Sequence, residues 1–176
     1  MDEFLDVVNE QNQLTGMQKL KSEIHRDNDW HRASHMWIYN DQGEILFQKR
    51  SLIKDTFPGK WDITGGHVGA GETYLNTAVR ELEEELGITV APEDLETLDM
   101  HKTEDIGREF QQVYLLRLNQ PSSSFRLQEE EVLEARFIPI KELRTHLTDK
   151  QARKKYCPVW PYYLRMVDII ESRIQS

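Results

Sequence analysis

The sequence predicts an α/β fold in which a mixed β-sheet carries helices on its faces. Short segments rich in β-branched and aromatic residues, bounded by turn residues, indicate strands along most of the chain. Residues 74–86 and 159–174 instead repeat apolar residues with the helical period, so each predicts an amphipathic helix. Strands interspersed with helices of this length are typical of a layered α/β domain.

The strand-like segments are separated by turn signals. Residues 40–43, Asn-Asp-Gln-Gly, divide two of them, and Pro58-Gly59 precedes a short one. The expected strands are Phe4–Asn9, His31–Tyr39, Glu44–Arg50, Trp61–Thr64, Glu109–Leu118 and Val132–Ile138. Residues 10–16 are expected to form a polar turn, and residues 17–25 a helical or irregular segment.

Start and stop signals frame the helices. Thr73 can cap the amino end of the helix over residues 74–86, and Gly87 can end it. Lys141–Leu147 is expected to be a short helix, and Val159–Ile174 a longer one. The apolar stripe of the last helix is expected to pack in the core; it includes Tyr163, Met166, Val167 and Ile170.

A length of 176 residues fits one domain, large enough to bury a core. We expect an N-terminal extension over residues 1–30, a core over residues 31–150 and a C-terminal helix within residues 151–176. The glycines that precede the helix over residues 74–86, at positions 65, 66, 69 and 71, indicate a loop where the backbone approaches other groups closely.

Composition excludes several classes of partner. The net charge of −9 argues against a nucleic-acid or anionic-membrane binder, either of which favours a basic face. No apolar run approaches the roughly 18 residues of a membrane span. The start, MDEFLDVVNEQN, lacks the basic and apolar regions of a signal peptide. Cys157 is the only cysteine, so no intrachain disulfide can form and a cytoplasmic location is expected.

Three glutamates on the predicted helix over residues 74–86 indicate a metal site. Glu81, Glu84 and Glu85 are spaced i, i+3 and i+4, which puts their carboxylates on one narrow helix face. Like charges at this spacing repel one another by a few tenths of a kcal/mol. A divalent cation such as Mg²⁺ would reverse that penalty, because carboxylates are hard oxygen ligands. The alternative is a solvated acidic face without a ligand.

The stretch from Gly66 to Ile88, GHVGAGETYLNTAVRELEEELGI, resembles the signature of the Nudix hydrolase superfamily. That signature is Gly, five residues, Glu, seven residues and then Arg-Glu-apolar-x-Glu-Glu-x-Gly-apolar. Its nine specified positions are occupied by Gly66, Glu72, Arg80, Glu81, Leu82, Glu84, Glu85, Gly87 and Ile88. A match of this length at fixed spacing is far more specific than an isolated glycine motif.

The resemblance implies an α/β/α sandwich with a mixed sheet, and hydrolysis of a nucleoside diphosphate linked to another group. It also implies Mg²⁺ or Mn²⁺ as the cofactor and a small diphosphate molecule as the substrate. Divalent cations suit this chemistry because they neutralise the diphosphate and lower the pKa of an attacking water. By the resemblance, Glu81, Glu84 and Glu85 bind the metal together with the carbonyl oxygen of Gly65.

The resemblance also assigns roles around the metal. Glu81 is a candidate general base, and Glu84 and Arg80 complete the expected catalytic group, with Arg80 orienting a glutamate. Glu72 supports Arg80 or an outer metal position, and it also suits the amino end of a helix. Some family members use a glutamate from a distal loop as the base. The run Glu129-Glu130-Glu131 could supply one here, or form a solvated turn.

Outside this signature the chain resembles one branch of the superfamily, the isopentenyl-diphosphate isomerases. The resemblance is carried by His31-Arg32-Ala33 and Trp37, Lys60-Trp61 after Pro58-Gly59, Gly66-His67, and Pro158–Trp160. Those isomerases hold a second metal with histidines and glutamates. The resemblance therefore implies a candidate second metal site, at His25, His31, His67 and Glu109. The place of a further glutamate is occupied by Gly107, and the alternative is that these histidines only pack or hydrogen-bond.

One position disfavours the isomerase reaction. The isomerases carry a catalytic cysteine just before the Gly-His pair, and here that residue is Gly65. Isomerisation needs an acid and a base on opposite faces of the carbon skeleton, and this chain lacks the expected cysteine. Cys157 is expected to be buried packing. The hydrolase is therefore the leading hypothesis, an isomerase-like enzyme the alternative, and a non-catalytic sensor of a phosphorylated ligand a third.

The substrate and the oligomeric state are not predicted. A nucleobase is usually recognised by aromatic stacking and a few polar groups, and each aromatic candidate could equally belong to the core. The candidates are Trp30, Trp37, Phe57, Phe110, Tyr114 and Trp160. The sequence leaves open whether the chain forms a homodimer.

Overall fold

The computed structural model describes residues 3–175 and has a mixed α/β fold with a central sheet, as predicted. Residues 1, 2 and 176, at the ends of the predicted single domain, lie outside the described residues. The chain forms two compact units. The first comprises the described residues up to Met36, Gly65–Leu82 and Thr89–Leu115; the second comprises Trp37–Thr64, Glu83–Ile88 and the described residues from Leu116.

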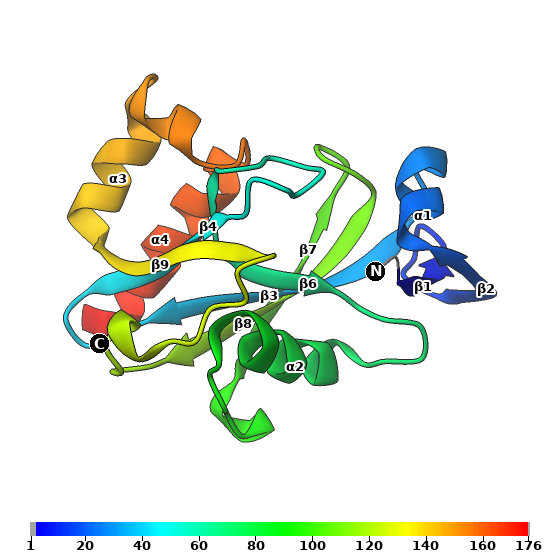
Figure 1. Cartoon of the computed structure of the whole chain (residues 1–176), viewed down its shortest axis with the longest axis horizontal. Coiled ribbons are helices and arrows are strands. Elements are labelled where there is room, and N and C mark those ends of the chain that lie inside the picture. The colour runs from blue at the N-terminus through cyan, green and yellow to red at the C-terminus, as the bar shows by residue number, and fades with distance from the viewer. Residues whose placement is uncertain (1–2, 176) are drawn as a thin grey trace. The chain divides into compact units, whose positions relative to one another are not determined.

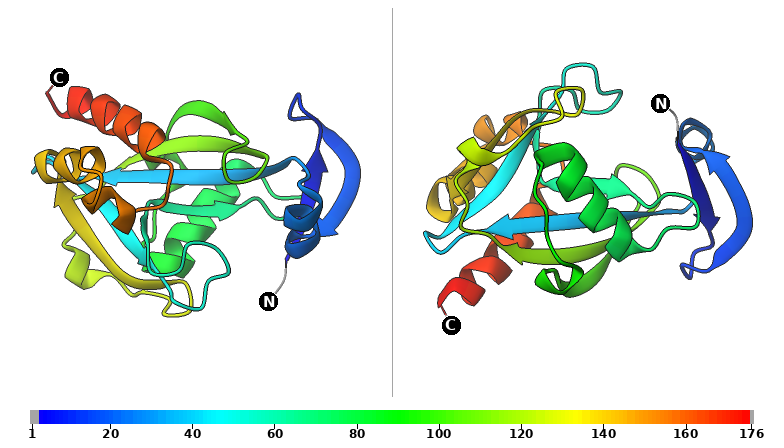
Figure 2. Two further views of the ribbon diagram at one scale, coloured as in Figure 1. Left: turned by 90° about the horizontal axis from the view of Figure 1, so that it is seen from above. Right: turned by 60° about the horizontal axis from the view of Figure 1, so that its bottom comes forward.

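The first unit begins with a hairpin in which β1 (Phe4–Val8) pairs antiparallel with β2 (Leu14–Leu20). The short helix α1 (Lys21–Asp27) packs beside the hairpin, and its Ile24 is buried against β1 (Figures 1 and 2). The predictions of a polar turn over residues 10–16 and of a helical or irregular segment over residues 17–25 are wrong for residues 14–20. These residues form a strand because they pair with β1, although most of their side chains are exposed.

The sheet of the first unit is built on β3 and β8. The strand β3 (His31–Tyr39) begins in this unit and pairs with β8 (Glu109–Arg117) and β6 (Thr64–His67). The strand β7 (Glu96–Thr103) pairs antiparallel with β8 and was not predicted. Only the last of its eight residues is buried, so pairing rather than an apolar pattern determines this strand.

The helix α2 (Tyr74–Leu86) begins and ends where the sequence predicts. The hydroxyl oxygen of Thr73 accepts a hydrogen bond from the Asn76 amide at 3.2 Å. At the other end Gly87 takes the left-handed conformation, with φ of 65°. Buried Ala78, Leu82 and Leu86 recur every four residues and form the apolar face of α2. The helix is uninterrupted, so the sequence spacing of its glutamates is also their spatial order.

In the second unit, β4 (Glu44–Arg50) pairs antiparallel with β9 (Val132–Pro139) and β5 (Trp61–Asp62). The expected strand Trp61–Thr64 is interrupted at Ile63, after which β6 begins. The helices are α3 (Ile140–Thr148) and α4 (Trp160–Gln175). Three short 3-10 helices complete the elements of residues 3–175: η1 (Pro92–Asp94), η2 (Ser122–Ser124) and η3 (Ala152–Lys155).

An aromatic core holds α4 in the second unit. The indole nitrogen of buried Trp37 donates a hydrogen bond of 2.9 Å to the hydroxyl of Tyr162. Trp37 also meets Phe47 and Tyr163 edge to face. The predicted apolar stripe of the last helix is confirmed, since all four of its residues are fully buried. Within residues 3–175, no helix is long and apolar enough to cross a membrane.

The end of α2 generates a prediction about stability. A Cβ atom at Gly87 would lie 2.9 Å from the Cβ of Arg126, whereas one at Gly43, also at positive φ, would meet no atom within 4 Å. Both alanine substitutions strain the backbone, but only Gly87→Ala adds a clash. We expect Gly43→Ala to lower the free energy of unfolding by about 1 kcal/mol and Gly87→Ala by about 2–3 kcal/mol in urea denaturation. Equal losses would contradict the contact with Arg126.

Candidate active site

Gly66 makes room for the first glutamate of α2. A Cβ atom at this position would lie 2.2 Å from the carboxyl carbon of Glu81, so any other residue here would displace that carboxylate. Glycine at position 66 therefore lets α2 bring its carboxylate directly against the backbone of β6. The preceding glycine is also confined, because a Cβ at Gly65 would lie 3.0 Å from the carbonyl oxygen of Ser34 and 3.1 Å from the ring of His35.

Arg80 lies between two carboxylates. Its Nε and Nη2 donate hydrogen bonds of 3.2 and 3.0 Å to Glu72, and its Nη1 donates one of 2.9 Å to Glu81. Glu72 also accepts hydrogen bonds from the Gly69 amide and the Thr77 hydroxyl. The hydrogen bonds from Arg80, followed by those from Thr77 and Gly69, lower the pKa of Glu72 against the opposing effect of burial. This network fixes Arg80, and through it one oxygen of Glu81.

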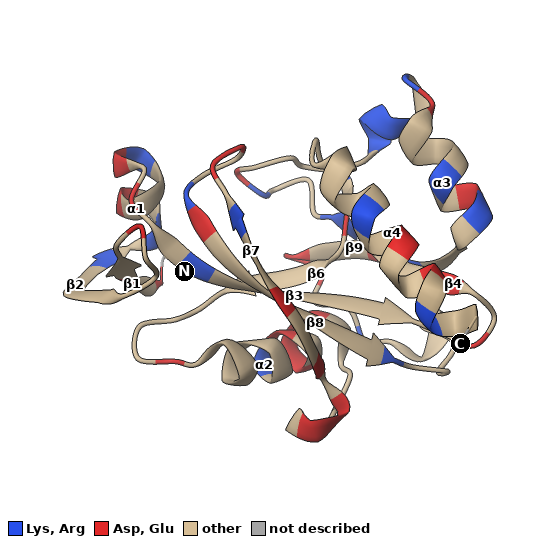
Figure 3. Cartoon of the chain, turned by 180° about the vertical axis from the view of Figure 1, so that it is seen from behind, with Lys and Arg blue, Asp and Glu red and all other residues tan. Residues whose placement is uncertain are grey.

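The other two glutamates differ in exposure. Glu84 is exposed, whereas Glu85 is only 6 % exposed (acidic residues of α2 are red in Figure 3). Glu85 accepts a hydrogen bond of 2.8 Å from the side-chain nitrogen of Gln48 on β4. The amide oxygen of Gln48 in turn accepts a hydrogen bond of 3.0 Å from the Thr64 hydroxyl. Gln48 and Thr64 were not predicted; a glutamine within the apolar run of β4 was the signal that could have identified them.

The oxygen donors of α2 fit a divalent cation. Carboxylates on one helix face are hard ligands of the type that Mg²⁺ and Mn²⁺ prefer. A carboxylate as buried as that of Glu85 requires polar partners, and the side-chain amide of Gln48 is one of them. The close approach of Glu81 to Gly66 adds backbone next to the same helix face.

The structure brings together His25, His31, His67 and Glu109. Each offers a ligand atom, and these four atoms lie within 4.8 Å of one another. They come from four elements of the first unit: α1, the start of β3, the end of β6 and the start of β8. The three imidazole rings have centroids 5.2 Å apart in every pair.

Glu109 is the buried anion of this cluster. One of its carboxylate oxygens lies 3.3 Å from His31 Nε2 and 3.6 Å from His67 Nε2, and the other accepts a hydrogen bond of 2.6 Å from Gln111. Burial raises the pKa of Glu109, but the two imidazoles outweigh it and hold this pKa well below its usual range. Burial also lowers the pKa of His67, to about 4, against the opposing effect of Glu109.

The hydrogen bond made by one ring nitrogen of His31 determines how the other nitrogen faces Glu109. Its Nδ1 lies 3.0 Å from the carbonyl oxygen of Asp29, which can only accept, so Nδ1 carries a proton. In neutral His31 the buried Nε2 then directs a lone pair at the Glu109 carboxylate, and it has no hydrogen-bond partner within the described residues. A metal ion or a second proton resolves this conflict, so the residues fit a cation.

Gly107 marks the place of the missing glutamate. A Cβ atom there would lie 4.0 Å from the carboxylate of Glu109, so position 107 is next to the cluster. Its φ of 137° strains any other residue. The cluster therefore has one carboxylate at this edge where the isomerase resemblance implies two.

Cys157 is buried in the second unit. Its sulfur lies 3.4 Å from a carboxylate oxygen of Asp62, and burial, with the charge of Asp62, raises the pKa of this thiol far above its usual range. Tyr163 donates a hydrogen bond of 2.6 Å to the other oxygen of Asp62. A thiol in this setting packs and donates weakly, which is what the sequence predicts.

The remaining expectations concern the distal base and the aromatic residues. Glu131 forms an ion pair with Lys54, while Glu129 and Glu130 are exposed. Trp30 and Phe110 pack against each other, with ring centroids 4.9 Å apart. Several of the aromatic candidates belong to the core: Trp30, Trp37, Phe110 and Tyr114 are all less than 9 % exposed. Trp160 instead lies under the guanidinium of Arg153, and Phe57 takes a positive φ of 49°.

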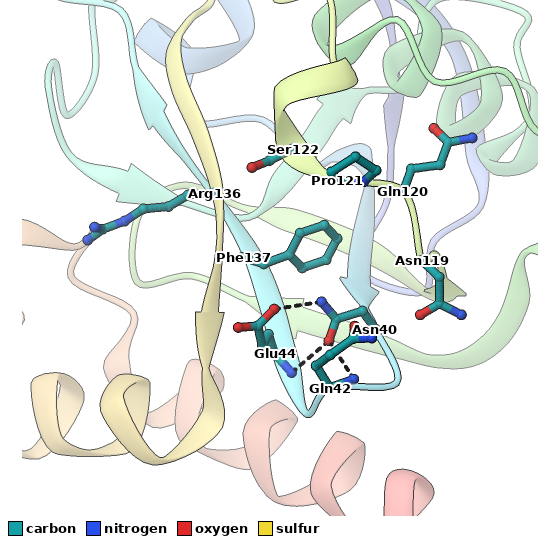
Figure 4. Close-up of a pocket in the computed structure, with 9 residues that line it drawn as sticks. All are labelled: Asn40, Gln42, Glu44, Asn119, Gln120, Pro121, Ser122, Arg136 and Phe137. Carbon is teal, nitrogen blue, oxygen red and sulfur yellow. Dashed lines mark hydrogen bonds between the residues drawn. The ribbon is translucent and has the colours of Figure 1, made fainter.

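A pocket of about 390 Å³ lies at the turn between β3 and β4 in the second unit (Figure 4). The ring of Phe137 lies between Pro121 and Glu44, and Asn40 is held to Glu44 by hydrogen bonds. None of the predicted catalytic or metal-binding residues lines this pocket. Its lining includes one carboxylate, from Glu44, and one guanidinium, from Arg136, and holds no cluster of metal ligands among the described residues.

Comparison with known proteins agrees with the site. The family model of the NUDIX domain matches residues 29–159. The chain is 37 % identical over 185 residues to Nudix hydrolase 3 of Arabidopsis thaliana, covering 99 % of this chain and 24 % of that protein. The chain thus spans about a quarter of that relative's length. It is 36 % identical over 158 residues to a Nudix hydrolase of Clostridium acetobutylicum, covering 85 % of this chain and 76 % of that protein.

The fold is also similar to a solved structure. The crystal structure of DR0079 from Deinococcus radiodurans aligns with a TM-score of 0.68 and 24 % identity, covering 88 % of this chain and 100 % of that one. The matched domain and the relatives indicate a hydrolase that acts on pyrophosphate bonds. With its glutamate helix, its glycine loop and a domain match over most of its length, the chain belongs to the Nudix hydrolase family.

Proposed function

We propose that the chain is a Mg²⁺-dependent pyrophosphohydrolase that cleaves a nucleoside diphosphate linked to another group. The carrying observation is Glu85, a buried carboxylate on the helix that also bears Glu81 and Glu84, which accepts a hydrogen bond from the amide of Gln48 on β4. A buried carboxylate does not stabilise a helix that has only a structural role, because its desolvation is unfavourable. Mn²⁺ would fit the same ligands.

Glu81, Glu84 and Glu85, with the carbonyl oxygen of Gly65, are the proposed ligands of the cation. When bound, such a cation neutralises the diphosphate and lowers the pKa of the attacking water. Arg80 holds one oxygen of Glu81 and is itself held by Glu72, so it orients this carboxylate. Glu81 is the proposed general base, because its carboxylate has a fixed orientation beside the backbone of Gly66.

We further propose that His25, His31, His67 and Glu109 hold a second metal ion. Three neutral imidazoles and one carboxylate suit Zn²⁺ or another transition metal better than Mg²⁺. The support is the bare Nε2 of buried His31, directed at the Glu109 carboxylate. Gln111 orients the carboxylate from the other side through its hydrogen bond.

This second cluster favours one alternative function. It contains the three histidines and one of the two glutamates that the isomerase resemblance implies, so an isopentenyl-diphosphate isomerase-like enzyme is the second candidate. Gly65 argues against it, and Cys157 is buried beside Asp62 with a raised pKa. Incubation with isopentenyl diphosphate, followed by NMR, decides the matter, because conversion to dimethylallyl diphosphate would replace the hydrolase proposal. A sensor would instead bind a nucleotide without turnover.

The glutamate helix gives the first test. With Mg²⁺ and a panel of nucleoside diphosphates linked to sugars or nucleotides, the unaltered chain is expected to release phosphate-containing products. Glu84→Gln and Glu85→Gln are each expected to lower kcat/KM about 100-fold or more, because each removes a charged ligand. Glu83→Gln is the matched control, since Glu83 is exposed on the same helix and occupies a position that the signature does not specify. Undiminished turnover in both ligand variants would refute the proposal.

The second site has its own test, independent of turnover. Purified protein is expected to retain about one equivalent of a transition metal by inductively coupled plasma mass spectrometry. Glu109→Gln should weaken this binding about 10- to 100-fold, because it removes the only carboxylate of the cluster. His101→Asn, which alters a histidine outside the cluster, should leave metal retention unchanged. Equal metal content in Glu109→Gln and the unaltered chain would show that the four residues only pack.

A further inference from the structure

Gln48 is a buried amide in an otherwise apolar setting. It follows the buried residues Ile45, Leu46 and Phe47 on β4 and is itself only 4 % exposed. Burying an amide is unfavourable unless its donors and acceptor find partners. The partners it has are Glu85 and Thr64, which lie on two other elements of the second unit.

The chemistry of these partners fixes the orientation of the amide. An ionised carboxylate can only accept, so Glu85 requires the nitrogen of Gln48 to face it, at 2.8 Å. The amide oxygen then faces Thr64, whose hydroxyl donates to it at 3.0 Å. Thr64 is only 2 % exposed, so bulk water cannot take the place of its hydroxyl as the hydrogen-bond donor to Gln48. The three side chains therefore form a chain of hydrogen bonds with one allowed direction, from Thr64 through Gln48 to Glu85.

The backbone around Glu85 is held as well. The backbone amide of Gln128 donates a hydrogen bond of 3.1 Å to the carbonyl oxygen of Glu85. The backbone amide of Arg126 donates one of 2.9 Å to the carbonyl oxygen of Leu86. These contacts fix the last turn of α2, and the hydrogen bond from Gln48 fixes the side chain on it. The hydrogen bond from Gln48 on β4 thus fixes the position of one carboxylate oxygen of Glu85.

The hydrogen bond from Gln48 reaches a carboxylate that the proposed function assigns to the metal. A hydrogen bond from a neutral outer residue to a ligating carboxylate typically changes metal affinity 10- to 100-fold when it is removed.

We propose that Gln48 is a positioning residue that directs the carboxylate of Glu85 toward the divalent cation of α2, with Thr64 holding Gln48 in the required orientation. The inference rests on the proposed function, because it assigns Glu85 to the metal. It adds a role for two residues that lie outside the Nudix signature.

The test measures metal binding rather than turnover alone. Mn²⁺ binding is followed by the electron paramagnetic resonance signal of the free ion, and the class of sites lost in Glu85→Gln identifies the site on α2. Gln48→Met keeps the volume but removes the donor, and we expect it to weaken that class about 10-fold or more. The Mg²⁺ concentration for half-maximal activity should rise by the same factor, while kcat at saturating Mg²⁺ falls much less.

Two further variants keep the test decisive. Thr64→Val removes the hydroxyl that donates a hydrogen bond to Gln48 but leaves Gln48 itself in place. We therefore expect a smaller weakening of Mn²⁺ binding, about 2- to 5-fold. This variant provides the test if Gln48→Met does not fold. Tyr162→Phe is the control, because it removes a buried hydrogen bond between Trp37 and Tyr162 that does not involve Glu85. It should leave Mn²⁺ affinity unchanged.

The outcomes separate the two proposals. If Glu85→Gln binds Mn²⁺ as the unaltered chain does, the metal assignment of the proposed function fails. If Glu85→Gln loses the site but Gln48→Met and Thr64→Val bind Mn²⁺ normally, only the role of Gln48 is overturned. Weakening by Tyr162→Phe to the same extent would also overturn it, because the effect would then follow from stability.

Discussion

The close approach of Glu81 to Gly66 is the constraint on which the site depends. With only hydrogen at position 66, the carboxyl carbon of Glu81 occupies space that a Cβ atom would fill at 2.2 Å. The capped, uninterrupted helix determines the order in which its glutamates follow one another along α2. Arg80 and Glu72 reinforce the contact from the loop side by fixing one oxygen of Glu81. The absence of a side chain at position 66 thus leaves room for the carboxylate of Glu81.

The acidic groups of this protein are oriented by partners of different charge. Glu81 receives a hydrogen bond from a guanidinium, Glu85 one from an amide, and Glu109 one from the amide of Gln111. The two amides each satisfy an oxygen of a buried carboxylate, which offsets part of the cost of burying it. Both amides lie on strands, which are rigid enough to hold a carboxylate in one orientation. The shared arrangement supports the proposal that both carboxylates bind cations.

Local signals in the sequence predicted much of the fold, and pairing between distant segments produced the rest. Both ends of α2 were predicted because Thr73 and Gly87 carry strong capping preferences. The strands β2 and β7 were missed because their side chains are mostly polar or exposed, and only their neighbours make them strands. The histidine cluster was expected from a family resemblance alone. Spacing along the chain could not show that α1, β3, β6 and β8 bring its four ligand atoms together.

The central claim is that α2 carries a divalent-cation site, and diffraction from crystals grown with Mn²⁺ tests it most directly. Manganese scatters anomalously, so its position can be read from an anomalous difference map without reference to activity. The account predicts a peak within coordination distance, about 2.0–2.3 Å, of carboxylate oxygens of Glu85 and its neighbours on α2. Well-ordered carboxylates on α2 without any peak beside them, at a Mn²⁺ concentration that supports turnover, would contradict it.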